Sequence, residues 1–271
     1  MSHINYVSIF APDGSEFFVA AAGEGRPLIL LHGFPLDHRL WTHQIQSLSH
    51  DFHVIAPDLR GFGKSTLGDG FSMVQLAHDC EFIRQKLAPQ GPIVLGGLSM
   101  GGYVALEYWA HYSQHLCGLV LANTKPHADD PTAQAARLRM AEEVLVQGTW
   151  PTVQGMLPKL LSTTTQTSRP EVVELTRTMM AAVAPQTIAA AQRAMAQRRD
   201  FRSELPEIAV PTLVITGQED PLAPPDATAE WAGSIPQHTF HAIPTAGHLT
   251  PLETPQEFNA LLGQFTRQAT S

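Results

Sequence analysis

The stretch Ile93-Val94-Leu95-Gly96-Gly97-Leu98-Ser99-Met100-Gly101-Gly102 joins an apolar run to a serine flanked by glycines. The apolar run is typical of a buried strand, and the following residues, Tyr103 to Tyr112, have a helical pattern. Gly97 and Gly101 permit a tight turn between the two elements, because side chains at these positions would collide with neighbouring chain. Strand, turn and helix together predict that Ser99 stands at the end of a sheet in the position of a nucleophile.

Apolar runs of similar length recur on both sides of this stretch, and helical patterns separate them. The expected strands are Leu28 to Leu31, Phe52 to Ala56, Ile93 to Leu98, Leu116 to Ala122, Thr212 to Thr216 and Thr239 to Ile243. The expected helices are at about Asp37 to Leu48, Ser72 to Leu87, Met100 to Tyr112, Pro225 to Ser234 and Pro255 to Arg267. This alternation predicts an α/β fold with a mostly parallel sheet flanked by helices.

Two segments depart from the alternation. At the N-terminal end, Pro12-Asp13-Gly14 separates the apolar runs His3 to Phe10 and Glu16 to Ala22, which predicts an antiparallel hairpin. Residues 125–205 show no convincing strand, and the prolines at 151, 158, 170 and 185 predict about four short helices there. We therefore expect an α/β core of residues 1–124 and 206–271, with residues 125–205 inserted between two strands as a helical cap.

A serine nucleophile needs a histidine that takes its proton and a carboxylate that orients the histidine. Asp220 directly follows the apolar run Leu213-Val214-Ile215, and His248 follows the next run, so both are expected at carboxyl ends of strands. This order of serine, acid and histidine is the order expected for a nucleophile in this setting. We expect Asp220 and His248 to be the partners of Ser99, in preference to Glu219, Asp226, His238 and His241.

Two backbone amides are candidates for stabilising an oxyanion. His32-Gly33-Phe34 directly follows the strand Leu28 to Leu31, and a turn there can aim the Phe34 amide at the serine. The Met100 amide lies at the positive end of the following helix and faces the same place. We expect Phe34 and Met100 to supply the two donors, with His32 shaping the turn.

Neither a metal nor a cofactor is predicted. His111 and His115 have the spacing of zinc ligands, but Tyr112 replaces the glutamate of a zinc-protease helix and no third ligand is evident. Gly61-Phe62-Gly63-Lys64-Ser65 has the end of a phosphate loop, but Asp58 stands where its first glycine is required. These residues instead predict a turn stabilised by Asp58, Arg60 and the glycines.

Composition limits the partners of the chain. The formal net charge of −8, with 17 Lys and Arg and no basic cluster, argues against nucleic acid and favours an uncharged substrate. No stretch approaches the roughly 20 apolar residues of a membrane span, so we expect no membrane partner and a cytoplasmic protein. Cys80 and Cys117 have no metal spacing and are expected to be core thiols.

The chain resembles the α/β-hydrolase superfamily over nearly its whole length. The resemblance rests on His32-Gly33-Phe34, Asp58 to Ser65, Gly97 to Gly102, Gly217 to Asp220 and Gly247-His248. Gly96 to Tyr103 and Leu119 to Thr124 are most similar to bacterial carboxylesterases, 3-oxoadipate enol-lactonases and cofactor-free haloperoxidases. Serine at position 99 argues against dehalogenases and epoxide hydrolases, which carry aspartate there.

The resemblance implies a serine hydrolase that cleaves a carboxylic ester or lactone through an acyl-enzyme on Ser99. Carbon-carbon bond hydrolysis and perhydrolysis on the same triad are alternatives, and a ligand receptor with weak turnover is a third hypothesis. Phe34 and cap residues with apolar side chains are expected to contact a small to medium, largely apolar substrate: Met140, Trp150, Met156 and Leu160.

Overall fold

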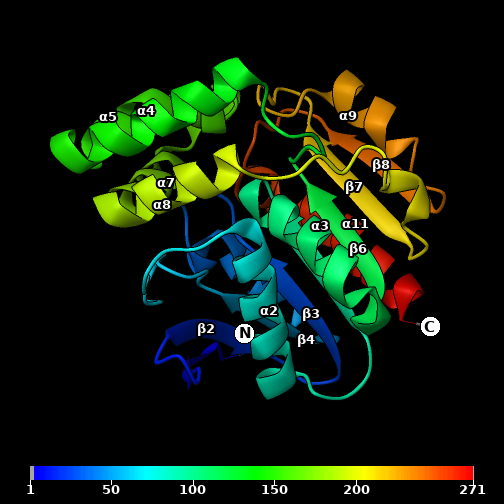
Figure 1. The fold of residues 1–271 in the computed structure, drawn as a ribbon. Helices are drawn as coiled ribbons and strands as arrows, with labels where there is room; N and C mark the ends of the chain where they lie inside the picture. Colours follow the sequence, from blue (N-terminus) through cyan, green and yellow to red (C-terminus); the bar gives the residue numbers. More distant parts are fainter. Residues whose placement is uncertain (1–2, 271) are drawn as a thin grey trace.

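A computed structural model describes residues 3–270, and within them eight strands form one sheet in the order β1-β2-β4-β3-β5-β6-β7-β8 (Figure 1). β1 pairs antiparallel with β2 and β2 pairs antiparallel with β4, whereas all other neighbours are parallel. The prediction of a mostly parallel sheet after an N-terminal hairpin is confirmed. The strands are β1 (Asn5–Phe10), β2 (Glu16–Ala22), β3 (Arg26–Leu31), β4 (Phe52–Pro57), β5 (Ile93–Leu98), β6 (Leu116–Ala122), β7 (Thr212–Gly217) and β8 (His238–Ile243).

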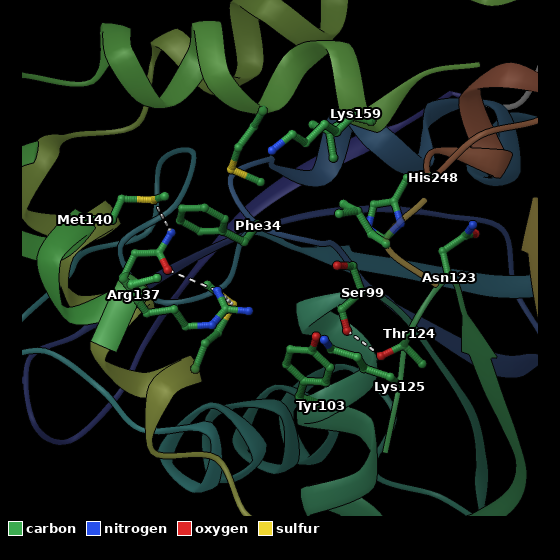
Figure 2. A pocket seen from close by; sticks show the side chains of 16 residues that line it. Phe34, Ser99, Tyr103, Asn123, Thr124, Lys125, Arg137, Met140, Lys159 and His248 are labelled. Atoms are coloured by element: carbon green, nitrogen blue, oxygen red, sulfur yellow. Dashed lines mark hydrogen bonds between the residues drawn. The ribbon is translucent and has the colours of Figure 1, made fainter. Parts of the chain in front are cut away.

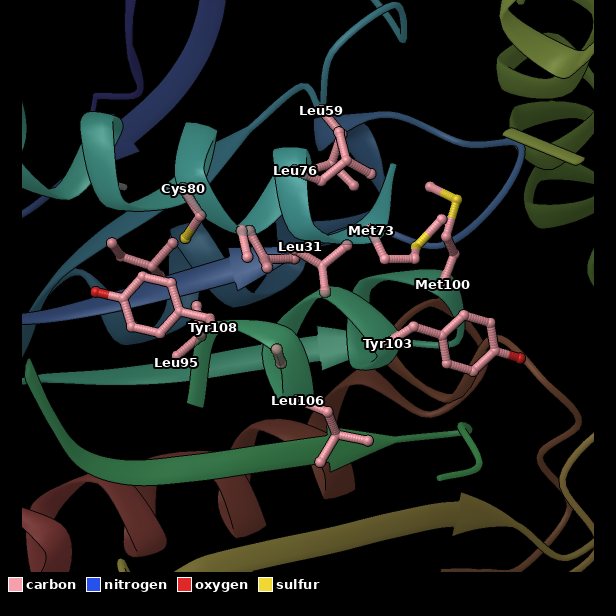
Figure 3. Packing of buried hydrophobic residues seen from close by; sticks show 14 of the residues in the cluster. Leu31, Leu59, Met73, Leu76, Cys80, Leu95, Met100, Tyr103, Leu106 and Tyr108 are labelled. Atoms are coloured by element: carbon pink, nitrogen blue, oxygen red, sulfur yellow. The ribbon is translucent and has the colours of Figure 1, made fainter. Parts of the chain in front are cut away.

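Helices cover both faces of this sheet, which explains why the central strands are apolar throughout. Successive residues of β5 point to opposite faces: Leu95 joins the hydrophobic cluster under α2 and α3, and Val94 joins the cluster under α1 and α11. Figure 3 shows the first cluster, where Leu76 and Cys80 of α2 face the sheet. The helices are α1 (Thr42–Leu48), α2 (Met73–Leu87), α3 (Met100–Tyr112), α9 (Pro225–Ala232), α10 (Thr250–Glu253) and α11 (Pro255–Ala269).

Short 3-10 helices complete the connections at η1 (His38–Trp41), η2 (Ser113–His115) and η3 (Leu205–Glu207). Local capping fixes several helix starts. The Ser72 hydroxyl accepts the Gln75 amide at the start of α2, and Pro255 occupies the first turn of α11, where no amide partner is needed.

Among residues 3–270, no helix has both the length and the apolar character needed to cross a membrane.

The segment between β6 and β7 is fully described and holds five helices, one more than expected. They are α4 (Pro131–Gln147), α5 (Trp150–Leu160), α6 (Thr163–Ser168), α7 (Pro170–Ala181) and α8 (Pro185–Ala196). Pro170 and Pro185 begin helices, as their missing amides favour. Pro158 was expected to separate two helices. It lies instead within the last turn of α5, two residues before the helix ends at Leu160.

These five helices lie beside the carboxyl ends of the parallel strands (Figure 1). One cavity is lined both by α4, α5 and α8 and by residues that directly follow β3, β5, β6 and β8. Open α/β sheets bind ligands at this edge, because loops of different strands converge there. The fold thus brings residues far apart in the sequence to one cavity.

Candidate active site

Ser99 occupies the turn between β5 and α3, with φ 55° and ψ −113°. A positive φ is strained for a non-glycine residue and persists only where the surroundings impose it. The surroundings do so here: the Ser99 amide donates to the Ala122 carbonyl at 2.9 Å, and the Thr124 hydroxyl donates to the Ser99 carbonyl at 2.8 Å. A Cβ at Gly97 would lie 2.1 Å from the Gly101 carbonyl oxygen, so the tight turn requires glycine.

His248 and Asp220 form a buried pair above the neighbouring strands. His248 Nδ1 lies 2.8 Å from Asp220 Oδ2, while the amides of Leu222 and Ala223 donate to Asp220 Oδ1 at 2.8 and 3.1 Å. Burial alone would raise the pKa of Asp220, but His248 and these hydrogen bonds outweigh burial and lower it below its ordinary value. Asp220 is therefore ionised at neutral pH and fixes the proton of His248 on Nδ1.

Ser99 and His248 line the same cavity, and the Ser99 side chain points into it (Figure 2). Among the described residues no hydrogen bond joins the Ser99 hydroxyl to the imidazole. Such bonds are commonly long in unliganded active sites and tighten when substrate binds. With Nδ1 held by Asp220, the other nitrogen of His248 is left to take a proton.

Asn123 is part of this arrangement and was not predicted from the sequence. Its side-chain amide donates to Asp220 Oδ2 at 2.9 Å, and its oxygen accepts the Thr250 hydroxyl at 2.7 Å. Asn123 has φ 47°, a conformation that asparagine tolerates better than most residues. A hydrogen bond to a residue 97 positions away leaves no local pattern in the sequence.

Glu253 holds the loop that carries His248. Its Oε1 accepts the amides of Gly247 and Leu249 at 2.9 and 3.2 Å, and its Oε2 accepts the Ser162 amide at 2.7 Å. Leu160, at the end of α5, accepts the amides of both His248 and Leu249 through its carbonyl at 3.1 Å. The histidine loop is therefore bonded on both sides of His248 to the segment between α5 and α6.

The turn after β3 brings the Phe34 amide beside the Ser99 turn. A Cβ at Gly33 would lie 2.9 Å from Leu98, which shows how closely the two turns approach. His32 fixes this turn: its Nε2 accepts the Leu59 amide at 3.0 Å, so its Nδ1 donates to the Gly33 carbonyl at 2.9 Å. Burial lowers the pKa of His32, in keeping with a neutral ring.

The amides of Phe34 and Met100 are available for a ligand. Among the described residues, neither amide donates a hydrogen bond to the protein. Met100 is the first residue of α3, where backbone amides have no partner within the helix and the dipole favours negative charge. The two amides therefore have the chemistry needed to hold an oxyanion next to Ser99.

The cavity beside Ser99 has a volume of about 240 Å³. Three of the four α4–α8 residues expected at the substrate line it, namely Met140, Met156 and Leu160, together with Phe34. Trp150 does not line it; the residue begins α5 and is 52% exposed. The other lining residues are Ser99, Tyr103, Asn123, Thr124, Lys125, Ala136, Arg137, Lys159, Gln192, Met195, Leu222 and His248.

Lys125 and Arg137, which line this cavity, belong to a charged cluster that was also not predicted. Asp129 is buried and bonds Arg198 Nη2 at 2.7 Å and Arg137 Nε, while Lys125 Nζ lies 3.9 Å from it. Arg198 also stacks over the Tyr103 ring at 4.5 Å. Burial would raise the pKa of Asp129, but the two arginines hold it at about 2. The five residues are spread over the sequence, and no local pattern marks them as a group.

One other cluster has the donor types of a metal site. Ligand atoms of Asp37, His38 and Asp58 lie within 4.8 Å of one another. Their hydrogen bonds account for this clustering: Asp58 Oδ1 accepts His38 Nδ1 at 2.7 Å, Asp58 Oδ2 accepts the Lys64 amide at 2.9 Å, and Arg39 binds Asp37. The Asp58 side chain thus holds the 61–65 turn.

The Asp129 cluster generates a prediction about stability. In Asp129→Asn, Arg198 loses its buried carboxylate, so we expect the free energy of unfolding at pH 7 to fall by about 3 kcal/mol. Because folding lowers the pKa of Asp129 from 3.8 to about 2, its contribution is complete above pH 4 and is lost as the pH falls toward 2. The difference from the unmodified chain should therefore shrink below pH 4.

Denaturant unfolding between pH 7 and pH 3 measures this difference. Asp69→Asn is the control, because Asp69 is exposed. An equal loss of stability in both variants would contradict the role of Asp129.

Comparison with known proteins places this geometry in a family. Residues 26–255 match the family model described as alpha/beta hydrolase fold. A curated relative, the AB hydrolase superfamily protein YisY of Bacillus subtilis, is 30% identical over 92% of this chain and 94% of its own length. The 3-oxoadipate enol-lactonase 2 of Acinetobacter baylyi is 27% identical over 86% of this chain and 85% of its own.

A solved structure shows the same fold closely. A thermophilic esterase from Thermogutta terrifontis, described as malate bound, superimposes with a TM-score of 0.95 at 39% identity, covering 98% of this chain and 100% of that one. The superfamily predicted from the sequence is confirmed by the family model and by these relatives. The chain belongs to the alpha/beta hydrolase family.

Proposed function

We propose that this chain hydrolyses a small carboxylic ester or lactone through an acyl-enzyme on Ser99. The observation that carries the proposal is the buried His248–Asp220 pair, 2.8 Å apart, beside a strained serine in one cavity. Relatives named as an enol-lactonase and as an esterase support ester hydrolysis. In this proposal residues 125–205 act as the cap that closes the site.

Acylation begins when the Ser99 hydroxyl oxygen attacks the carbonyl carbon. The free ring nitrogen of His248 takes the hydroxyl proton, and Asp220 stabilises the imidazolium that forms. The carbonyl oxygen becomes an oxyanion, which accepts hydrogen bonds from the Phe34 and Met100 amides. When the intermediate collapses, His248 returns the proton to the leaving alcohol, and the acyl group stays on Ser99.

Deacylation repeats these steps with water as the nucleophile. His248 takes a proton from water, the hydroxide attacks the acyl carbon, and the second tetrahedral intermediate uses the same two amides. Collapse of that intermediate releases the carboxylic acid and returns the proton to Ser99. Met140, Met156 and Leu160 are proposed to contact the acyl chain, since they line the cavity that Ser99 faces.

Replacing the nucleophile tests the proposal directly. In Ser99→Ala, kcat on a short aryl ester should fall by at least about 10⁴-fold, because no acyl-enzyme can form. Ser203→Ala, a change at an exposed serine, is the control and should retain full activity. Mass spectrometry of the unmodified chain after reaction with an aryl phosphonate should locate one adduct on Ser99. Hydrolysis that persists in Ser99→Ala would reject the assignment.

The bonds of Glu253 generate a second prediction. Glu253→Gln replaces an acceptor by a donor facing backbone amides, which loosens the loop around His248. We expect kcat on the aryl ester to fall by about tenfold, corresponding to about 1.4 kcal/mol in the barrier. Glu257→Gln, an exposed glutamate at the start of α11, is the matched control. If both variants keep the same kcat, Glu253 does not position the base.

A further inference from the structure

The cavity beside Ser99 contains more positive than negative charge. Lys125, Arg137 and Lys159 line it, so two of the four lysines of the chain face one cavity although the chain as a whole carries a net charge of −8. Among the described residues that line it there is no carboxylate, and Asp129, which contacts Lys125 and Arg137, already binds the buried Arg198. A wholly apolar substrate would desolvate these cations without offering them a partner.

Two of these cations have donors that bond no described residue. Arg137 donates through Nε to Asp129 and through Nη1 to Gln192 at 3.0 Å, but its Nη2 bonds no residue within 3–270. The Lys159 ammonium likewise has no hydrogen-bond or ion-pair partner among the described residues. The Nη2 group of Arg137 therefore has unbonded donors that can bind a carboxylate oxygen.

The position of these groups relative to the nucleophile is clear in Figure 2. Ser99 and His248 lie on one side of the cavity, Arg137 lies on the opposite side, and the Lys159 side chain extends into the space between. Arg137 comes from α4 and Lys159 from α5. A substrate whose carbonyl reaches Ser99 would therefore extend toward the cations.

The ion pairs alone do not account for this arrangement. The single negative charge of Asp129 already balances Arg198, whose side chain is 3% exposed. Arg137 and Lys125 add two further positive charges beside the same carboxylate. Burial lowers the pKa of Lys125, and repulsion from the neighbouring Arg198 lowers it further. A bound anion would relieve that repulsion.

We propose that Arg137 and Lys159, supported by Lys125, form a carboxylate-binding subsite, and that the substrate is an ester or lactone bearing a second, free carboxylate. This inference rests on the proposed ester hydrolysis and narrows its substrate class to half-esters and carboxylated lactones. It replaces the uncharged, largely apolar substrate expected from the net charge. The apolar lining residues Met140 and Met156 then contact the methylene chain between the two carbonyl groups.

A matched pair of substrates tests the subsite. Monomethyl adipate and methyl hexanoate have acyl chains of equal length and differ in a terminal carboxylate. The ratio of their kcat/KM values should favour the half-ester and should fall by about tenfold or more in Arg137→Gln and in Lys159→Gln. Arg139→Gln, at an exposed residue of the same helix that does not line the cavity, should leave the ratio unchanged.

If Arg137→Gln does not fold, Lys159→Gln alone still tests the subsite. Lys159 is exposed, and removing its charge breaks no bond to a described residue. Raising the salt concentration should lower the ratio in the unmodified chain. Equal kcat/KM values for the two esters, or an equal fall in Arg139→Gln, would overturn the subsite.

A binding measurement separates this inference from the proposed function. Calorimetry with Ser99→Ala should detect adipate binding that weakens by about tenfold when Arg137→Gln or Lys159→Gln is added. Adipate binding with this dependence, in a chain that hydrolyses no ester, would support the subsite and reject the proposed function. Ser99-dependent hydrolysis of methyl hexanoate without adipate binding would do the reverse.

Discussion

The first turn of α3 packs directly onto the backbone of β3: a Cβ at Gly101 would lie 2.3 Å from the Leu31 carbonyl oxygen. This contact, with the equally close approach at Gly97, forces Ser99 into its positive φ and aims its side chain out of the sheet. It also sets the Met100 amide beside the serine. The proposed nucleophile and one proposed oxyanion donor are thus positioned by one backbone constraint, and the other groups of the site have to be brought to that point.

Buried polar side chains bring the other groups there. Asn123 links Asp220 and Thr250 to the end of β6, and Glu253 supports the loop of His248. The bonds of Asn123 join segments that follow β6, β7 and β8, and Glu253 joins the β8 loop to Ser162, so the carboxyl edge of the sheet is one connected network. Buried polar groups of this kind are costly when unpaired and rigid when paired, which suits a site that needs fixed geometry.

The sequence predicted the sheet, the serine turn and the superfamily, because these depend on local patterns: apolar runs, glycines at fixed offsets and short motifs. It missed Asn123, Glu253 and the Asp129 cluster, because their partners are distant in the chain and an isolated polar residue has no pattern. Pro158 does not separate two helices as the sequence suggested. It lies in the final turn of α5, which continues to Leu160. The expectation of an uncharged substrate, drawn from the net charge of −8, stays a prediction; a sum over the whole chain does not report that Lys125, Arg137 and Lys159 line one cavity.

The Leu160 carbonyl and the Ser162 amide are bonded to the loop of His248, directly or through Glu253. The segment proposed to close the cavity is therefore also part of the support for His248. If that segment swings outward to admit substrate or release acid, His248 loses backbone bonds at the same moment. In the proposed mechanism such an open form would be a poor catalyst, and an acyl group on Ser99 would wait for closure before water is activated. Substrate access and reactivity would then alternate.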